Sequence, residues 1–370
     1  MKKILITGGH VTPALAVIQG LKNKFKDDIN IVFVGRKYAF ENEKTLSFEY
    51  KEIKKRGIEF ISIETGRLTR IISLKTIRSI MRIPLGVFNA YKILKRQKPD
   101  VILSFGGYIA LPIALWSFIF KIPLYTHEQT IHPGLSNRII GIFAKRVFIA
   151  FKDTQSYFDK NKVVLTGNPI RPIIFNTISK PFIIKKDKPV IYITGGSLGS
   201  HSINNKIGNI IYELLKKYII IHQVGDSVEY KDYEKLVKLR KTFPVNLQKN
   251  YFLSKHFLEH EIGYIYSVCD IVVGRSGANT FFELISLKIP AVFIPLPWSA
   301  NDEQKKHAYI FKQAGTGEIF LQKEESCKLI QLINKVAVNI YKYIYNFKTL
   351  QYLNSENAVN KIIKEIFNNS

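Results

Sequence analysis

The tetrapeptide Ile-Thr-Gly-Gly occurs twice, at 6–9 and at 193–196, and each copy ends a short apolar run that opens one half of the chain. Further apolar runs of strand length follow both copies, with helical patterns between them. They lie at 3–7, 29–34, 101–105, 123–126 and 146–149, and again at 190–194, 219–223, 271–273 and 291–294. This alternation predicts parallel strands joined by crossover helices. Because 370 residues also exceed the size at which one core keeps growing, we predict an α/β protein of two doubly wound, Rossmann-like domains. Their glycine turns would face a common cleft.

The boundary between the two domains is predicted near Gly167-Asn168-Pro169. Pro172 and a lysine-rich, strand-poor stretch at 173–189 follow it, which is typical of a linker. We therefore expect one domain at 1–169 and a second at 170–349.

Residues 270–308 carry the most specific local pattern. A buried strand at 270–273 and a tight turn at 274–277 lead into a helix at 278–287, and another strand follows at 291–295. The N-H groups that start such a helix bind anions, most often phosphate, and Arg275 and Ser276 would add donors there. Glu283 on that helix and Gln304 beyond it are suited to hydrogen bonds with sugar hydroxyls. An ordinary Rossmann crossover has the same spacing, so this pattern alone leaves both interpretations open.

Six ordered motifs extend the pattern over nearly the whole chain. They are R-S-G-A-x-T-x-x-E with a later x-D-x-Q at 275–304, TGGHVTPALAV at 7–17, SFGGYIALP at 104–112, HEQ at 127–129, TGNPIR at 166–171 and GGSLGS at 195–200. In these motifs the chain resembles glycosyltransferase family 28, the N-acetylglucosaminyltransferases of peptidoglycan synthesis.

The resemblance implies the GT-B fold, with a last helix at about 350–370 packed back on the first domain. It implies inverting transfer of GlcNAc from UDP-GlcNAc to the MurNAc 4-hydroxyl of an undecaprenyl-diphosphate acceptor, without a cofactor. The residues it assigns to UDP-GlcNAc are Thr130, Arg171, Ser197, Ala278, Asn279, Thr280, Glu283 and Gln304, and those assigned to the acceptor diphosphate are Thr7, Gly8, Gly9 and His127. Thr130 departs from the family, which usually carries Asn at this position.

Two side chains are candidates for general acid-base catalysis. His10 follows the first glycine turn, where an imidazole would take the proton of an acceptor hydroxyl, and a neutral hydrogen-bonding or helix-capping histidine is the alternative. Glu128 stands at the end of another strand beside His127, where a structural pair is equally consistent with the pattern. The chain contains no Asp-x-Asp, so we expect no divalent metal at the donor site.

The net charge of the chain, +26, favours an anionic membrane surface or a pyrophosphate substrate over nucleic acid, because no nucleic-acid-binding fold is recognisable. Residues 67–98 hold nine Lys or Arg and no acid, interleaved with large apolar side chains. From this interfacial pattern we predict a membrane patch that includes Ile77, Arg78, Met81, Arg82, Leu85 and Phe88. Two helices with a solvated basic face are the alternative.

The N-terminus lacks the features of a signal peptide, and two cysteines cannot form a disulfide framework. The uncharged run at 101–120 is divided by Gly106-Gly107 and Pro112, which predicts a strand and a mostly buried helix in place of a membrane span. We therefore expect a peripheral protein on the cytoplasmic face of the bacterial inner membrane, with room for partners among the cell-wall synthesis proteins.

Two other functions fit the same residues. One is another nucleotide-sugar enzyme of this fold, such as a UDP-GlcNAc epimerase or a glycolipid glycosyltransferase. The other is a basic membrane- or nucleic-acid-binding protein without catalysis. UDP release in the presence of the lipid acceptor distinguishes all three.

Overall fold

The computed structural model describes residues 1–38, 45–66, 81–196, 199–227 and 229–368. The chain divides into two compact units. The N-terminal unit comprises Met1–Arg171 with Ser355–Ser370, and the C-terminal unit comprises Pro172–Asn354. Three of the predicted site and patch residues, Ile77, Arg78 and Ser197, lie outside the described residues.

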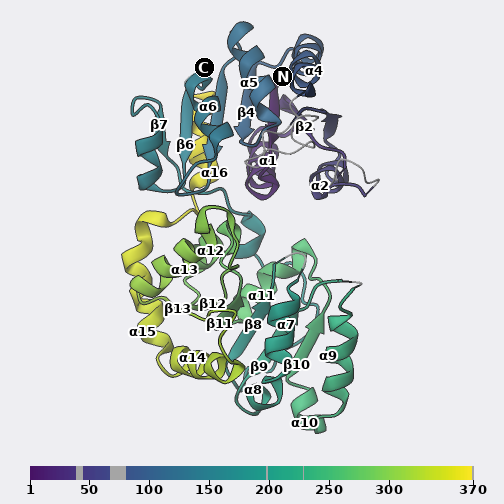
Figure 1. Ribbon diagram of the computed structural model, residues 1–370, viewed down its shortest axis with the longest axis vertical. Coiled ribbons are helices and arrows are strands. Elements are labelled where there is room, and N and C mark those ends of the chain that lie inside the picture. The colour runs from purple at the N-terminus through teal and green to yellow at the C-terminus, as the bar shows by residue number, and fades with distance from the viewer. Residues whose placement is uncertain (39–44, 67–80, 197–198, 228, 369–370) are drawn as a thin grey trace. The chain divides into compact units, whose positions relative to one another are not determined.

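A seven-stranded parallel sheet forms the centre of the N-terminal unit (Figure 1). Its strands, in chain order, are β1 (Lys2–Gly8), β2 (Ile29–Gly35), β3 (Glu59–Ser62), β4 (Val101–Phe105), β5 (Leu124–Glu128), β6 (Arg146–Ile149) and β7 (Val163–Leu165). In space the order is 3-2-1-4-5-6-7, so the chain reverses its direction of growth between β1 and β4. Ligands of doubly wound sheets bind at such a switch point, outside the carboxyl ends of the strands.

Helices cover both faces of this sheet because successive strand residues point to opposite sides. Ile4 and Ile6 of β1 pack on one side with α1 (Val11–Phe25), α2 (Phe48–Lys55) and α16 (Ala358–Phe367). Leu5 packs on the other side with α4 (Ile83–Gln97), α5 (Ala110–Ile119) and α6 (Leu135–Phe143).

The last helix, α16, belongs to the N-terminal unit although it ends the chain. Its buried side chains Val359, Ile362, Ile363 and Ile366 join the core that α1 also covers. Figure 1 shows this yellow helix among the purple and blue elements of the N-terminal unit. The chain therefore passes between the units twice, after Arg171 and after Asn354.

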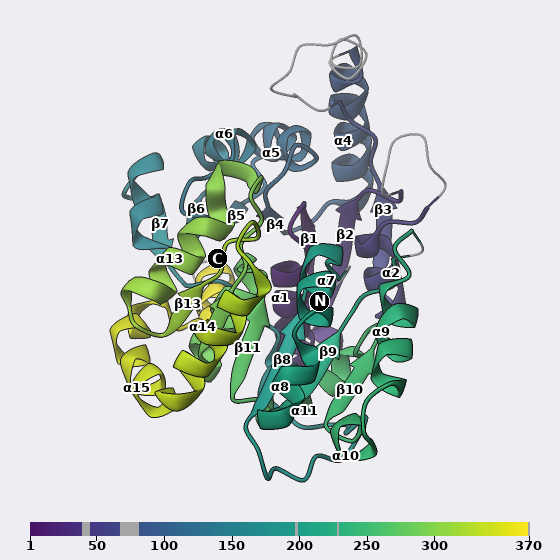
Figure 2. The same cartoon turned by 60° about the horizontal axis from the view of Figure 1, so that its bottom comes forward.

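The C-terminal unit repeats the same strand order on a six-stranded parallel sheet. The strands are β8 (Val190–Thr194), β9 (Ile219–Gln223), β10 (Tyr251–Ser254), β11 (Ile271–Gly274), β12 (Ala291–Phe293) and β13 (Gly317–Ile319), in the spatial order 10-9-8-11-12-13. Figure 2 shows β8, β9 and β10 side by side with α8 (Ile211–Lys217) close to them. The switch point of this sheet lies between β8 and β11.

The helices of the C-terminal unit again form two layers. One core gathers α7 (His201–Gly208), α8 and α14 (Ser326–Val338) against the sheet. Aromatic contacts with the strands come from α11 (Ile262–Val268) and α13 (Glu303–Gln313), and α13 also contacts α12 (Ala278–Leu287). The remaining α-helices of this unit are α9 (Asp232–Lys241), α10 (Val245–Gln248) and α15 (Ile340–Tyr345). Among the 3₁₀ helices, Lys152–Tyr157 lies in the N-terminal unit, and Pro172–Phe175 and Asn346–Leu353 lie in the C-terminal unit.

The predicted fold class, α/β with two doubly wound sheets, is confirmed. The expectation of a mostly buried helix after β4 is wrong for its second half. Ala110, Ile113 and Ala114 are buried, but Phe118 and Ile119 are 64% and 51% exposed. Uniform hydrophobicity hides this difference, because α5 has no polar residues that would mark its outer face.

Candidate functional site

The first glycine turn is built by a close approach of β1 and β4 at the switch point of the N-terminal sheet. Gly8 has a φ of 145°, and a Cβ there would lie 2.7 Å from the backbone of Phe105, so only glycine fits. The N-H of Gly9 donates to the carbonyl of Gly106 at 3.0 Å. This turn places the N-terminus of α1, with its uncompensated N-H groups, at the carboxyl end of the sheet. Thr7 is fully buried, and its hydroxyl has no hydrogen-bond partner among the described residues.

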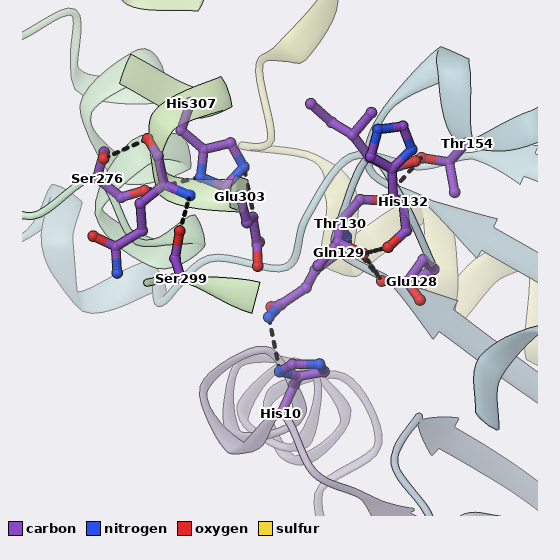
Figure 3. Close-up of polar contacts among 12 residues, drawn as sticks. His10, Glu128, Gln129, Thr130, His132, Thr154, Ser276, Ser299, Glu303 and His307 are labelled. Atoms are coloured by element: carbon purple, nitrogen blue, oxygen red, sulfur yellow. Dashed lines mark hydrogen bonds and ion pairs between the residues drawn. The ribbon is translucent and has the colours of Figure 1, made fainter. Parts of the chain in front are cut away.

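His10 occupies the N-cap position of α1 but makes no side-chain capping bond to the helix. Its ring is exposed to solvent, and its Nδ1 lies 2.8 Å from Nε2 of Gln129 (Figure 3). Desolvation by the surrounding protein lowers the pKa of His10 below its usual value of 6.5, and the negative charge of Glu128 opposes this shift. The structure thus presents a neutral imidazole that solvent or a ligand can reach.

Glu128, the second candidate for catalysis, is 2% exposed and fully engaged by its neighbours. Its Oε1 accepts the Thr130 N-H at 2.8 Å and lies 2.7 Å from the Thr130 hydroxyl, and its Oε2 accepts Nδ2 of Asn137 at 2.8 Å. Because both oxygens already accept hydrogen bonds and the side chain is buried, a substrate hydroxyl could reach this carboxylate only by displacing these partners. The geometry therefore favours His10 over Glu128 as the base, and it gives Thr130 a partner within the N-terminal unit.

His127 lies deeper than a ligand contact would require. The residue is 1% exposed, and its Nε2 lies 3.1 Å from the carbonyl of Gly167, to which it donates in the neutral ring. Burial lowers its pKa to about 4. The structure supports a structural role, in which His127 ties β5 to the turn that leads out of the unit.

A pocket of about 700 Å³ lies in the N-terminal unit beyond Thr130. Its lining includes His132, Lys152, Tyr157 and Lys160. Nδ1 of His132 and the Tyr157 hydroxyl are 2.7 Å apart. The Thr154 hydroxyl donates to the carbonyl of Thr130 at 2.9 Å, so this pocket and the loop after β5 are joined directly.

The predicted anion site of the C-terminal unit lies where β11 turns into α12. The helix spans Ala278–Leu287, as the sequence predicts, and Gly277 caps it without a side-chain bond. The first helical N-H to find an acceptor is that of Phe281, so the N-H groups of Ala278, Asn279 and Thr280 lack helical partners. The Oδ1 of Asn279 is buried without a hydrogen-bond partner in the described part of the chain. Backbone donors are therefore available at this helix start.

Arg275 does not add its guanidinium to that helix start, contrary to our expectation. It is 8% exposed, and it donates to the carbonyl of Ile294 and to side-chain oxygens of Ser200, Ser202 and Gln322, at 2.8–2.9 Å. Burial lowers its pKa to about 10, so it remains a cation at neutral pH. Ser200 is the N-cap of α7 and ends the second glycine loop, in which Gly199 has a φ of 74°. The guanidinium therefore holds the residue that ends the glycine loop, Ser200, by a hydrogen bond. No local motif in the sequence indicates this role.

Glu283 and Gln304 take part in contacts within the C-terminal unit. Glu283 is 2% exposed, and its Oε2 accepts the Tyr266 hydroxyl at 2.9 Å. Gln304 is half-buried, and its Oε1 accepts the N-H of Leu296 at 3.1 Å. The sequence motif locates both residues but does not identify Tyr266, which lies on another helix.

His307 supports the turn that carries Ser276. Its Nδ1 donates to the Ser276 carbonyl at 2.9 Å, while the Ser276 hydroxyl donates to the carbonyl of Gln304 at 2.7 Å (Figure 3). The imidazole is fully buried and stacks on Phe281, and burial lowers its pKa to about 4. Sequence reasoning missed this residue, because nothing in its neighbours distinguishes it from a surface histidine.

Arg171 is half-buried at the end of the N-terminal unit, where the chain first passes to the other unit. No group of three or more potential metal-binding side chains is found in the described residues. Likewise, none of the helices in the described ranges is long and apolar enough to cross a membrane.

The described part of the predicted membrane patch forms an exposed apolar surface with basic neighbours. Met81, Leu85 and Phe88 are 74%, 47% and 51% exposed, and Nζ of Lys92 lies 4.4 Å from the centre of the Phe88 ring. Tyr91 joins α4 to α5 through Trp116 and Phe120. The helix α5, whose second half is exposed, therefore packs against α4, the helix that carries Leu85 and Phe88.

Two Rossmann-like units, each with a glycine turn at the switch point of its sheet, are the architecture of the GT-B class. The comparisons with known proteins then give the family. Residues 7–149 match the N-terminal domain of glycosyltransferase family 28, and residues 190–366 match its C-terminal domain. The chain belongs to glycosyltransferase family 28.

Similar proteins from bacteria match nearly the full length of the chain. A protein of Clostridium tetani named UDP-N-acetylglucosamine--N-acetylmuramyl-(pentapeptide) pyrophosphoryl-undecaprenol N-acetylglucosamine transferase is 33% identical, over 99% of this chain and 98% of its own. A Bacillus cereus protein with the same name and the number 2 is 32% identical over 99% of both chains.

Solved structures share the fold. Acinetobacter baumannii MurG has a TM-score of 0.73 at 24% identity and covers 99% of both chains. UDP-GlcNAc 2-epimerase of Neisseria meningitidis, bound to UDP-GlcNAc, has a TM-score of 0.66 at 16% identity over the whole of both chains.

Proposed function

We propose that this glycosyltransferase moves GlcNAc from UDP-GlcNAc to the 4-hydroxyl of MurNAc in undecaprenyl-diphosphate-MurNAc-pentapeptide. The observation that carries this proposal is the 33% identity, over 99% of the chain, to a relative named for that transfer. The fold alone would not separate a transferase from an epimerase, since both kinds of enzyme have similar structures.

In the proposed reaction the acceptor O4 attacks the anomeric carbon and gives its proton to His10. The bond from that carbon to the diphosphate oxygen breaks, its electron pair leaves with UDP, and the configuration inverts from α to β. The leaving UDP gains negative charge on its terminal phosphate, which helix N-termini stabilise. The starts of α7 and α12 would supply those N-H groups, and the cation of Arg275 lies at the start of α7, where it donates to the N-cap Ser200.

The C-terminal unit is the proposed donor domain, with Ser197, Ala278, Asn279, Thr280, Glu283 and Gln304 as its contacts. Further donor contacts by Thr130 and Arg171 remain predictions. The glycine turn at Thr7, Gly8 and Gly9 is proposed to meet the acceptor diphosphate through backbone N-H groups, since the side chain of Thr7 is buried. We propose no such contact for His127.

The patch on α4 is proposed to hold the protein against the anionic cytoplasmic leaflet, where its lipid acceptor lies. Exposed apolar side chains beside lysines and arginines bind such surfaces, and each cation contributes about 1 kcal/mol. Met81, Leu85 and Phe88 have the required exposure.

The proposed function is tested by UDP release from UDP-GlcNAc with and without the lipid acceptor, together with analysis of the sugar products. We expect UDP release that depends on the acceptor and a β-linked disaccharide on the lipid. Formation of UDP-ManNAc without acceptor would indicate an epimerase instead. Binding to vesicles without any turnover would indicate a protein that only binds membranes.

The role of His10 is tested separately with His10→Ala. Loss of a general base acts on the transition state, so we expect kcat to fall by about 10²- to 10⁴-fold. Affinity for UDP-GlcNAc, measured by calorimetry, should stay unchanged. A higher acceptor KM with a preserved kcat would show that His10 only binds the acceptor.

A further inference from the structure

Gln129 provides the closest polar contact of the proposed base. It follows β5 directly, is 8% exposed, and lies with its Nε2 at 2.8 Å from Nδ1 of His10. Figure 3 shows its side chain extended toward the imidazole. Its Oε1 is buried and has no hydrogen-bond partner among the described residues. Glu128, by contrast, directs its oxygens to Thr130 and Asn137.

This contact decides which ring nitrogen can meet the acceptor. Because Nδ1 is engaged by Gln129, Nε2 is the nitrogen left for an incoming hydroxyl. When the amide N-H donates to Nδ1, the neutral ring carries its proton on Nε2 and cannot accept another one there. A half-turn of the amide brings Oε1 opposite Nδ1. The ring then carries its proton on Nδ1, and Nε2 offers a lone pair.

Both catalytic states of the ring require this second arrangement. Before the reaction Nε2 must be unprotonated, so Nδ1 carries a hydrogen that needs an acceptor. After the acceptor O4 has transferred its proton to Nε2, both nitrogens carry hydrogens, and Nδ1 still needs the same acceptor. Oε1 of Gln129 is the atom that can take this position after the half-turn.

We propose that Gln129 is the positioning residue of His10, and that its Oε1 accepts the Nδ1 hydrogen in the state that deprotonates the acceptor hydroxyl. The proposal rests on the proposed role of His10 as the base. Beside many catalytic histidines, one carboxylate both orients the ring and stabilises its protonated form. Here these two roles are divided between Gln129 and Glu128. Gln129 orients the ring, and Glu128 acts on its charge through space.

The charged and titratable groups around the ring agree with this division. Desolvation lowers the pKa of His10, and the negative charge of Glu128 opposes that shift through space. Burial lowers the pKa of His127 to about 4, so His127 is neutral near pH 7. An amide at position 129 adds no charge. A carboxylate there would stabilise the imidazolium directly and raise its pKa.

Two variants at this position separate orientation from other roles. Gln129→Met keeps the length of the side chain but removes the hydrogen bond, and we expect kcat to fall by about 10- to 100-fold while affinity for UDP-GlcNAc is unchanged. Gln129→Glu can only accept a hydrogen bond, so it should keep kcat within a few-fold. It should also move the acidic limb of the kcat/KM profile to higher pH. Gln19→Met, on the exposed side of α1, is the matched control.

The contact can also be measured without substrate. ¹⁵N NMR of the histidine rings, with His10 assigned from the signals lost in His10→Ala, reports which nitrogen carries the proton. We expect Gln129→Glu to show the Nδ1 hydrogen and Gln129→Met to differ from the wild type in its Nδ1 signal. If the wild type releases no UDP with the lipid acceptor, the proposed function fails, and the NMR result still tests the contact.

Two results would overturn the proposal. The first is a Gln129→Met enzyme with wild-type kcat and unchanged ring signals. The second is a Gln129→Glu enzyme that loses as much activity as Gln129→Met, because an amide needed as a donor cannot be the acceptor proposed here.

Discussion

Arg275→Met tests whether the buried guanidinium supports the donor loop or only the fold. Methionine keeps the apolar stem but removes contacts to four acceptors, two of them the buried carbonyl of Ile294 and the side chain of Gln322. A buried acceptor left without a donor costs about 1–3 kcal/mol, and the hydroxyls of Ser200 and Ser202 can find other partners. We therefore expect the free energy of unfolding to fall by about 2–4 kcal/mol.

The same substitution should weaken the binding of UDP. Ser200 caps α7, so losing its contact with Arg275 loosens the helix start that is proposed to meet the diphosphate. The positive charge beneath that helix start also disappears. We expect the Kd for UDP to rise about 10- to 100-fold, equivalent to about 1.4–2.7 kcal/mol.

Urea unfolding and calorimetric titration with UDP measure the two effects, and Arg240→Met is the matched control. The guanidinium of Arg240 also donates to a carbonyl, that of Gln248, but it lies on α9. We expect the control to lose stability without losing affinity for UDP. An unchanged UDP affinity in folded Arg275→Met would refute the link to the donor, and an unchanged stability would refute the energetic reasoning.

Further predictions concern the donor, metals, the membrane and pH. Glu283→Ala should weaken UDP-GlcNAc binding by about 1.5–3 kcal/mol in calorimetry. Tyr266→Phe, which removes the hydroxyl that donates to Glu283, should change UDP-GlcNAc binding much less, and equal losses would contradict a sugar contact. EDTA should leave most transferase activity intact, whereas a loss reversed by Mg²⁺ or Mn²⁺ would show that a metal is needed. Arg82→Glu should reduce co-sedimentation with anionic vesicles at low salt, while Lys238→Glu on α9 should not. Since the pKa of His307 is about 4 when folded and about 6.5 when unfolded, the unfolded chain binds more protons between these values. The contribution of His307 to stability should therefore fall by up to about 1.4 kcal/mol per unit as the pH drops through that window, and His307→Gln should make the slope shallower by that amount.

The central strands could be predicted from the sequence because each is an apolar run buried on both faces. The strands at the edges could not. β3, β7, β10 and β13, which the sequence analysis did not predict, are the outermost strands of the two sheets. They are three or four residues long, and β3 and β7 contain no fully buried residue, so their apolar runs are too short to predict a strand.

The site could be predicted only as far as its motifs reach. His10, Glu283 and the start of α12 belong to local patterns that match a family. Which residues pair with them, Gln129 with His10 and Tyr266 with Glu283, depends on which strand or helix lies beside which, and tertiary packing decides that. Arg275 shows the limit most clearly, because its position beside Ser276 suggests a ligand contact, while the structure turns its guanidinium toward Ser200.

The two glycine turns begin from the same tetrapeptide and the same strand order but end in different chemistry. After the first turn the N-cap of α1 is His10, held by a neutral amide from the residue after β5. After the second, the N-cap of α7 is Ser200, held by a buried cation from the residue after β11. A permanent positive charge beside His10 would disfavour the imidazolium and so weaken it as a base, whereas beside a diphosphate site the same charge strengthens binding. A neutral partner in one unit and a cationic partner in the other would therefore suit the proposed roles of the two copies, deprotonation of an acceptor in the first and binding of a leaving nucleotide in the second.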